Sequence, residues 1–132
     1  MGLISWATNE HEFDKLIEIV IGAAYEVANV LGCGFLEKVY ERALVNELIQ
    51  RGISVQSQTV FAVSYKGHPV GDYIADLLVD GRVIVELKCM DCFSNEHMAQ
   101  CINYLKASGI RIVLLINFQR PKVEWKRIIY GF

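Results

Sequence analysis

The sequence predicts an α/β domain in which helices flank a mixed β-sheet. Three observations support this prediction: two early segments have helical periodicity, three strand-like segments follow them, and a later helical segment precedes the fully apolar run 112–116. Hairpin-linked strands followed by a helix and a buried strand require antiparallel and parallel neighbours in one sheet. The 132 residues fit a single domain over positions 1–132.

Two amphipathic helices are expected first. Over residues 10–31 the apolar positions advance by four and three, which defines one helix face: Leu16, Val20, Ala23, Val27 and Val30. A Gly-Cys-Gly turn at 32–34 interrupts this helix. A second helix is expected over residues 35–51, before a stop at Gly52, with an apolar stripe of Leu36, Val39, Tyr40, Ala43, Leu44 and Leu48.

Strands and a third helix follow. Residues 54–65 alternate in part, residues 66–69 form a turn, and residues 70–79 and 82–89 form a hairpin around Asp80-Gly81. Ser94 is the expected N-cap of a helix that runs to about residue 107 and ends at Gly109. Its capping box is expected to be incomplete, because His97 stands where Glu or Gln is usual.

Two further strands complete the chain. Residues 111–117 are apolar almost throughout, as expected of a central strand buried on both faces. After Pro121, residues 123–130 are expected to form a last strand at the edge of the sheet. The predicted order of elements is therefore α-α-β-β-β-α-β-β.

The composition limits the classes of function. A net charge of −2 provides no overall basic field to attract nucleic acid, although the last quarter of the chain is its most basic part. The 53% share of hydrophobic residues predicts a buried sheet and an apolar surface used in a homo-dimer. No apolar run is long enough to span a membrane, and the first residues lack the features of a signal peptide. A cytoplasmic protein is expected, with its four cysteines reduced.

Three charged residues in the apolar hairpin indicate a functional site. Asp76 lies on the first strand, and Glu86 and Lys88 lie two apart on the second, so these last two point to the same side. Burying unpaired charges is costly, and a divalent cation held by two carboxylates would compensate for it. The structural alternative is a salt bridge between Glu86 and Lys88, with Asp76 near the end of the sheet.

The hairpin register decides whether Asp76 can join the other two. A two-residue turn at Asp80-Gly81 would pair Asp76 with Val85 and point it away from Glu86. A three-residue loop over 79–81, with a left-handed glycine in a bulge, would pair it with residue 84 and place it diagonal to Glu86. A shared site therefore predicts an odd register.

The order of motifs resembles the PD-(D/E)xK nuclease superfamily. Gln100 and Tyr104 lie four apart on one face of the third helix, one turn after His97. Asp76 matches the aspartate of that superfamily, 86–88 (Glu-Leu-Lys) its E-x-K, and Gln100 with Tyr104 the Q-x-x-x-Y of its RecB-type exonucleases. Ala75 replaces the proline. The resemblance implies a restriction-endonuclease-like core, α-β-β-β-α-β, with an extra N-terminal helix and a C-terminal edge strand.

A narrower resemblance extends over nearly the whole chain beyond about residue 14. Residues 34–40, Gly-Phe-Leu-Glu-Lys-Val-Tyr, are similar to the signature of the small bacterial GxxExxY proteins. The similarity continues through Glu41, Asp76, Glu86, Leu87, Lys88, His97, Gln100, Asn103, Tyr104, Leu105, Asn117 and Phe118.

These resemblances imply roles for the site residues in a divalent-metal-dependent nuclease, with DNA favoured over RNA as the substrate. Asp76, Glu86 and the Leu87 carbonyl would bind Mg²⁺ or Mn²⁺, and Lys88 would position the attacking water and stabilise the phosphate.

The same resemblances imply roles for residues on the helices. Gln100 and Tyr104 would orient Lys88 or the substrate, and His97 and Tyr40 are the expected substrate contacts. Glu37 would reach the metal through a water. Alternatively, Glu37 is a carboxylate stabilised by the dipole of its helix.

Two other classes of function remain open. The first is a non-catalytic module that keeps the nuclease fold and binds nucleic acid or protein; the modest charge favours it. The second is a zinc-binding module, because Cys89, Cys92, His97 and Cys101 are spaced one residue short of a CCHC zinc knuckle. Ordinary thiols are favoured over zinc, since Cys89 closes a strand while His97 and Cys101 belong to a helix.

Overall fold

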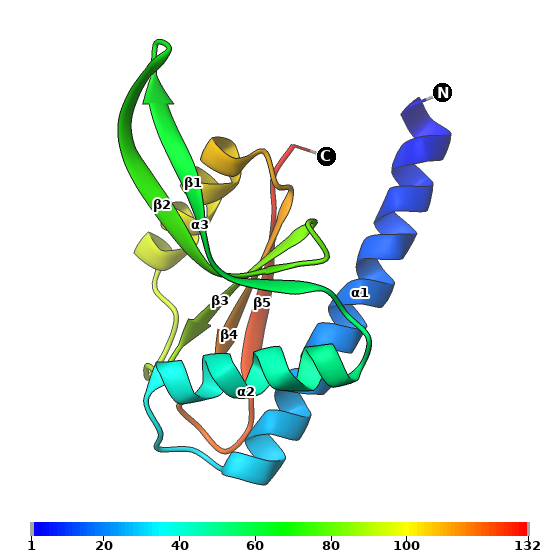
Figure 1. The fold of residues 1–132 in the computed structure, drawn as a ribbon, viewed down its shortest axis with the longest axis vertical. Helices are drawn as coiled ribbons and strands as arrows, with labels where there is room; N and C mark the ends of the chain where they lie inside the picture. The colour runs from blue at the N-terminus through cyan, green and yellow to red at the C-terminus, as the bar shows by residue number, and fades with distance from the viewer. Residues whose placement is uncertain (1, 132) are drawn as a thin grey trace.

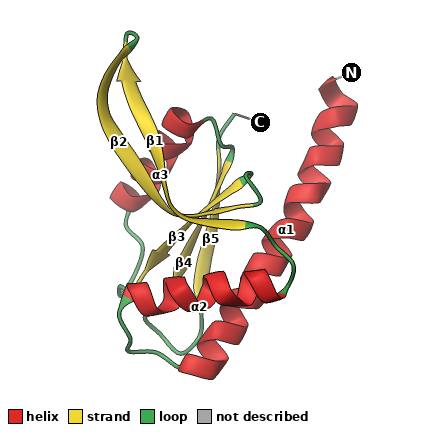
Figure 2. Cartoon of the chain, viewed as in Figure 1, coloured by secondary structure: helices red, strands yellow, loops and turns green. Residues whose placement is uncertain are grey.

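The computed structural model describes the backbone of residues 2–131 and the side chains of residues 13–131. The elements follow the predicted order (Figures 1 and 2): α1 (Gly2–Leu31), α2 (Glu37–Gln50), β1 (Val55–Tyr65), β2 (His68–Val79), β3 (Val83–Lys88), α3 (Asn95–Ser108), β4 (Ile112–Asn117) and β5 (Glu124–Ile129). The five strands form one sheet in the order β1-β2-β3-β4-β5. Only β3 and β4 are parallel, so the predicted mixed sheet is confirmed.

Helices cover both faces of this sheet. The residues of β3 alternate between the faces, as in any strand. Val83, Val85 and Leu87 pack against α1 and α2, whereas Ile84 belongs to a second cluster on the α3 side. Glu86 therefore points to the α3 side together with Ile84. The fully buried strand β4 lies between β3 and β5, as its apolar sequence predicted.

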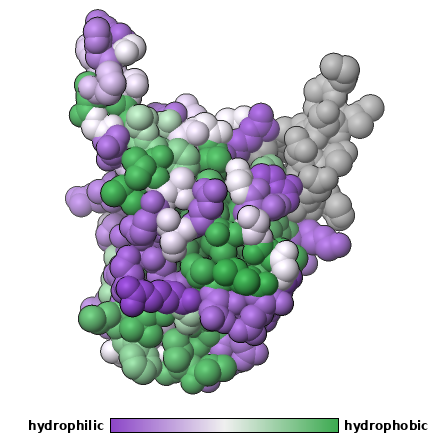
Figure 3. All heavy atoms as spheres, viewed as in Figure 1, coloured by the Kyte–Doolittle hydropathy of each residue, from purple (hydrophilic) through white to green (hydrophobic). Residues whose placement is uncertain are grey.

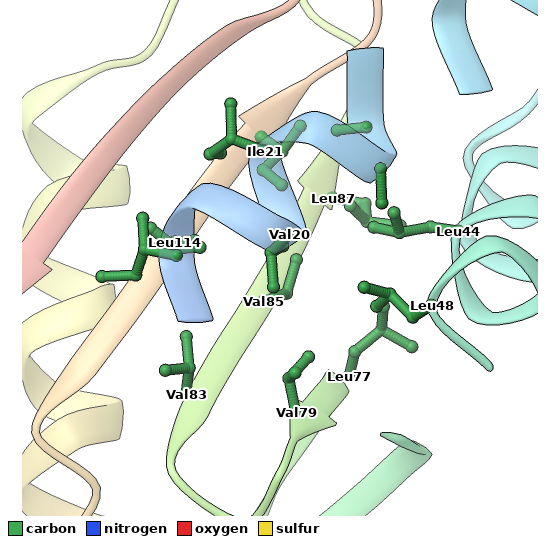
Figure 4. Close-up of a cluster of buried hydrophobic side chains, with 14 of the residues drawn as sticks. Val20, Ile21, Leu44, Leu48, Leu77, Val79, Val83, Val85, Leu87 and Leu114 are labelled. Carbon is green, nitrogen blue, oxygen red and sulfur yellow. The ribbon is translucent and has the colours of Figure 1, made fainter. Parts of the chain in front are cut away.

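The larger core lies between the sheet and the first two helices. Figure 4 shows Val20 and Ile21 of α1 and Leu44 and Leu48 of α2 directed at side chains of β2, β3 and β4. Fully burying an aliphatic side chain contributes about 1.5–3 kcal/mol, so this layer is the main apolar contribution to stability. It fixes the strands whose opposite face carries the charged residues.

The observed helices differ from the predicted ones in the start of α1 and in the membership of the apolar stripes. Helix α1 begins at Gly2 rather than near residue 10. The apolar stripes also include Val30 and Leu36, whose side chains are 74% and 79% exposed. Both residues lie next to the turn that joins α1 to α2, at the end of the helical layer, where the sheet does not cover them (Figure 1). Within the described part of the chain, no helix has the length and hydropathy needed to cross a bilayer.

The prediction of an incomplete capping box at α3 is wrong. The hydroxyl of Ser94 accepts the His97 backbone N–H (3.2 Å), and the His97 ring nitrogen Nδ1 accepts the Ser94 backbone N–H (3.1 Å). Histidine thus replaces the usual Glu or Gln, because an unprotonated ring nitrogen is also an acceptor. Gly109 ends the helix with φ at 74°, as predicted.

The β1–β2 hairpin bends at Asp76. Leu77 and Val79 face the α1–α2 core, whereas Tyr73 and Ala75, also odd-numbered, belong to the α3-side cluster. If side chains alternated strictly along β2, all four residues would lie on the same face of the sheet. They do not, so the face that the odd-numbered residues occupy changes at Asp76. Gln58 lies across from Asp76 in β1 and has φ at 54°. Beyond this bend the hairpin extends alongside α3 (Figure 1).

Candidate active site

The turn between β2 and β3 has an odd register, as a shared site required. The observed pairs are Leu77 with Val85, Leu78 with Ile84, and Val79 with Val83, so the loop has three residues. The predicted loop over 79–81 is displaced by one residue, and the true loop is 80–82. Asp76 and Glu86 are therefore level with each other across the two strands rather than diagonal.

The two strands separate next to this pair. Ladder pairing between β2 and β3 ends at Leu77 and Val85, although β3 continues to Lys88. The Leu87 N–H donates to Asp76 Oδ2 (2.9 Å) instead of to a strand partner. Because the N–H and C=O of a strand residue point to the same edge, the Leu87 carbonyl also points toward Asp76. The Lys88 carbonyl points to the other edge and accepts the Phe118 N–H (2.9 Å).

A cleft of about 590 Å³ opens between this edge and α3. Its walls come from the bent hairpin, from β3 and from α3. Six of the predicted site residues line it together: Asp76, Glu86, Lys88, His97, Gln100 and Tyr104. Residues 28 positions apart in sequence thus meet in one concave site.

Glu86 is a buried carboxyl with a raised pKa in the cleft. Its side chain is 6% exposed. Its pKa is raised from 4.5 to about 7, chiefly by burial; Lys88 and a hydrogen bond with the Asp76 backbone oppose this rise, and the negative charges of Glu41 and Glu37 add to it. Such a carboxyl is poised to change charge near neutral pH, which is characteristic of functional sites.

Tyr73 is a cleft residue that the sequence did not predict. Its hydroxyl donates to Glu86 Oε1, and its ring stacks on Tyr104 with centroids 3.5 Å apart and on Phe61 with centroids 6.1 Å apart. Burial, and then the Glu86 charge, raise the pKa of Tyr104. The Tyr104 phenol therefore stays protonated, and the Tyr73 hydroxyl acts as a donor to Glu86. Strand alternation gave no signal for Tyr73, because it reaches the cleft only through the bend at Asp76.

Helix α3 supplies one wall of the cleft. The Ser94 N–H donates to Nδ1 of His97, so in the neutral ring Nε2 carries the proton and can donate. Gln100 is exposed, and Tyr104 lies one turn further along on the same side. The N-cap thus fixes the orientation of a histidine that lines the cleft.

Two carboxylates of α2 lie behind the cleft rather than in it. Glu37 Oε2 accepts the backbone N–H of Cys89, one residue beyond Lys88 (3.3 Å). Glu41 is 6% exposed and accepts Gln58 Nε2 (3.0 Å) and Lys38 Nζ (3.5 Å). Both raise the pKa of Glu86 through their charge, and the effect of Glu41 is the larger. The family resemblance implied a role for Glu37, whereas it included Glu41 without a role.

The structure does not bring Tyr40 into the cleft. Its side chain is completely buried and stacks on Phe118 with centroids 4.6 Å apart. Its hydroxyl donates to the Gly32 carbonyl (2.7 Å) and accepts the Phe35 N–H (3.2 Å). A buried ring has no surface for a substrate contact, so Tyr40 fastens the turn that leads into α2.

Asn117 fixes the end of β3 and was not predicted as a site residue. Its side chain is 1% exposed; Nδ2 donates to the Met90 carbonyl (2.7 Å), and Oδ1 accepts the Met90 N–H (3.2 Å). The signal was present: a polar residue that ends a buried apolar strand needs hydrogen-bond partners. Asn117 lies beside Lys88 in the parallel ladder, so it anchors the chain that follows the lysine.

Comparison with known families agrees with this geometry. A model described as the PD-(D/E)XK nuclease superfamily matches residues 14–128. The chain belongs to the PD-(D/E)XK nuclease superfamily. No curated protein and no solved structure matches it. The five-stranded mixed sheet with helices on both faces is consistent with the restriction-endonuclease-like fold of this superfamily.

The zinc interpretation finds no support in the described residues. They contain no group of three or more His, Cys, Asp and Glu side chains arranged to hold a metal. Nδ1 of His97 is engaged with Ser94, and Cys101 is 3% exposed. Burial, and then the charge of Glu86, raise the pKa of the Cys101 thiol to about 11.

Nucleases of this superfamily generally use divalent metals. The donor chemistry of the cleft fits a hard cation: two carboxylates, Asp76 and Glu86, are level across the gap between β2 and β3, and the Leu87 carbonyl points toward the same gap. The raised pKa of Glu86 is consistent with a carboxyl whose charge a bound cation would compensate.

Proposed function

We propose that this member of the superfamily is a divalent-metal-dependent nuclease that hydrolyses phosphodiester bonds in nucleic acid. The observation that best supports this proposal is the meeting of Asp76, Glu86 and Lys88 with the α3 side chains in one cleft. Two carboxylates and a lysine beside an open strand edge are the groups that metal-assisted hydrolysis requires.

Asp76, Glu86 and the Leu87 carbonyl would hold Mg²⁺ or Mn²⁺. When bound, such a cation supplies Lewis-acid polarisation of a phosphoryl oxygen and lowers the pKa of water. Tyr73 orients the Glu86 carboxylate by donating to Oε1. Lys88, which lines the cleft beside Glu86, orients the attacking water and stabilises the negative charge that develops on the phosphate.

The α3 residues bind the substrate and position the lysine. His97 donates from Nε2 to a phosphate oxygen, and Gln100 and Tyr104 orient Lys88 or the strand being cut. Glu37, which is hydrogen-bonded to the Cys89 N–H, holds the end of β3 and would contact a cation only through water.

We further propose that the chain is a GxxExxY protein and that DNA is its substrate. The backbone supports the first proposal: Gly34 has φ at 107°, which favours glycine, and Tyr40 bridges the turn around it. The glycine and the tyrosine of the signature thus stabilise the same turn. The glutamate between them, Glu37, bonds to the backbone just beyond the end of β3. DNA is favoured over RNA through the resemblance of Gln100 and Tyr104 to the RecB-type exonuclease motif.

A cleavage assay tests the proposed activity. The purified protein is incubated with single- and double-stranded DNA and RNA, in Mg²⁺, in Mn²⁺ or in EDTA, beside Lys88→Ala. We expect cleavage with metal, none in EDTA, and at least a hundredfold loss of rate in the variant, because one preorganised electrostatic contact is worth about that much. Lys122→Ala, at an exposed lysine outside the cleft, is the matched control. Equal rates in Lys88→Ala and wild type would reject the activity.

A non-catalytic binding module is the competing proposal. The charge of −2, together with Asp72, Asp76 and Glu86 in one cleft, favours it, because phosphate binding needs cations. A folded protein that cleaves no substrate under any metal condition would support the module, whether or not it binds nucleic acid. Cleavage that depends on Lys88 would exclude it.

We also propose that the protein forms a homo-dimer in the cytoplasm. The apolar residues around the α1–α2 turn support the dimer: Figure 3 shows apolar surface at this end of the molecule, where Val30, Leu36 and Val39 are exposed. The four cysteines are all unpaired, which agrees with a reducing compartment. Sedimentation of wild type and Leu36→Glu measures the dimer. A monomeric wild type would contradict it.

A further inference from the structure

A second hollow continues the cleft along α3. It has a volume of about 610 Å³ and is lined by Ala62, Val63, Ser64, Asn103, Lys106 and Ala107. Val63, Asn103 and Ala107 also line the candidate active site. The two hollows therefore form one groove between the outer part of the hairpin and α3.

The two walls of this groove differ in chemistry. Helix α3 presents hydrogen-bonding side chains at Gln100 and Asn103, and Lys106 at the far end, where its ammonium also lies 5.5 Å from the Tyr130 ring centroid. The hairpin presents apolar surface at Val63 and Ile74. Amide donors and cations suit phosphates and sugars, whereas apolar surface suits the faces of unstacked bases.

The depth of the groove distinguishes between nucleic-acid forms. Glu86 lies at its inner end and is 6% exposed, so a phosphate must enter the groove to reach it. In a duplex the bases are paired and stacked on one another, so their faces cannot contact the apolar wall. A single strand bends freely and can expose its bases to the hairpin wall.

We propose that this groove binds single-stranded nucleic acid and leads it to Glu86 and Lys88, an inference that rests on the proposed nuclease function. The eleven residues from His97 to Ala107 span about 15 Å of helix, so the groove is long enough for a short stretch of a single strand. Lys88 and Lys106 lie in different hollows of the groove, and Asp72, Asp76 and Glu86 also line it. With so few cations, binding is weak and depends on the apolar wall as well as on phosphate contacts.

Binding is measured in EDTA, so that no chemistry takes place. Fluorescence anisotropy compares a labelled 12-nucleotide DNA strand, the RNA strand of the same sequence and the 12-bp DNA duplex. We expect the single strands to bind at least tenfold more tightly than the duplex. Ala107→Trp fills the junction of the two hollows and should weaken single-strand binding at least tenfold. Ala99→Trp, at an exposed α3 position outside the groove, is its matched control.

Lys106→Glu provides a second variant that does not alter packing at the junction. It should weaken single-strand binding several-fold at low salt, whereas Lys122→Glu should not. Duplex binding equal to single-strand binding, or unchanged binding in both groove variants, would overturn the proposal. Single-strand binding that depends on the groove without any cleavage in Mn²⁺ would uphold the groove and reject the nuclease. Cleavage of duplex that neither groove variant affects would support the nuclease and reject the groove.

Discussion

The two faces of the sheet differ although the same strands build them. Toward α1 and α2, β3 presents Val83, Val85 and Leu87 to a continuous apolar layer. Toward α3, the intervening positions begin with Ile84 and then become Glu86 and Lys88. The charged face is tolerated because β2 leaves β3 beside Glu86 and a cleft opens there. One face therefore stabilises the fold, and the other uses that stability to hold ionisable groups in a partly buried place.

Introducing a charge on the apolar face of the sheet should have the largest effect on stability. Val85 is completely buried between the sheet and the helices, one residue before Glu86. An aspartate there has no partner, so Val85→Asp should destabilise the protein by several kcal/mol and abolish cooperative unfolding. Circular dichroism during thermal unfolding measures this effect. Lys88→Ala is the control on the other face and should unfold near the wild-type temperature; a folded Val85→Asp would contradict the distinction.

The pH dependence of stability should sharpen the comparison next. The pKa of Glu86 is raised from 4.5 to about 7, so the folded state binds its proton more tightly than the unfolded state does. The resulting stability is fully present below pH 4.5 and is lost as the pH rises through about 7. At about 1.36 kcal/mol per unit, the loss amounts to about 3 kcal/mol.

Denaturant unfolding in EDTA at pH 5 and pH 8.5 measures this loss. Glu86→Gln should remove most of the difference between the two pH values, because glutamine does not ionise. Glu26→Gln, at an exposed position, should keep it. An identical pH dependence in wild type and Glu86→Gln would contradict the assignment.

The smallest expected effects come from removing one tyrosine hydroxyl on each face of the sheet: Tyr40 on the α1–α2 side and Tyr73 on the α3 side. Tyr40→Phe removes the contacts to Gly32 and Phe35 and should lower the free energy of unfolding by about 1 kcal/mol. Tyr73→Phe keeps the stack on Tyr104 but removes the donor to Glu86. It should change stability less and reduce the cleavage rate about tenfold. Unfolding and cleavage are measured on both variants, and a larger loss of activity in Tyr40→Phe would reverse the interpretation.

Most elements could be predicted because their signals are local. Helical periodicity located the buried residues Leu16, Val20, Leu44 and Leu48, and the unbroken apolar run located β4. Exposed Val30 and Leu36 were wrongly included in the stripes, since periodicity does not tell where the covering sheet ends. The prediction of an incomplete capping box failed for a similar reason. The sequence pattern considers only residue types, whereas the ring nitrogen of His97 accepts the Ser94 N–H as a Glu or Gln side chain would.

The candidate site could be predicted where its residues share an element. Glu86 and Lys88 follow from strand alternation, and Gln100 and Tyr104 from helical spacing. Tyr73 and Glu41 could not be placed, because each acts through a partner on another element, Glu86 and Gln58 respectively. Asn117 gave a signal as the polar end of a buried strand, but its partner Met90 could not be predicted.

The sequence alone determined the order of the elements, the faces of the helices, and the condition that the β2–β3 turn be odd in register. These depend on periods of 2 and 3.6 residues and on turn chemistry, which operate over a few positions. Only the tertiary structure decided that β2 bends at Asp76, that Tyr73 thereby reaches Glu86, and that a groove runs along α3. The physical reason is that burial, and with it the charge state of Glu86, depends on segments far apart in the chain.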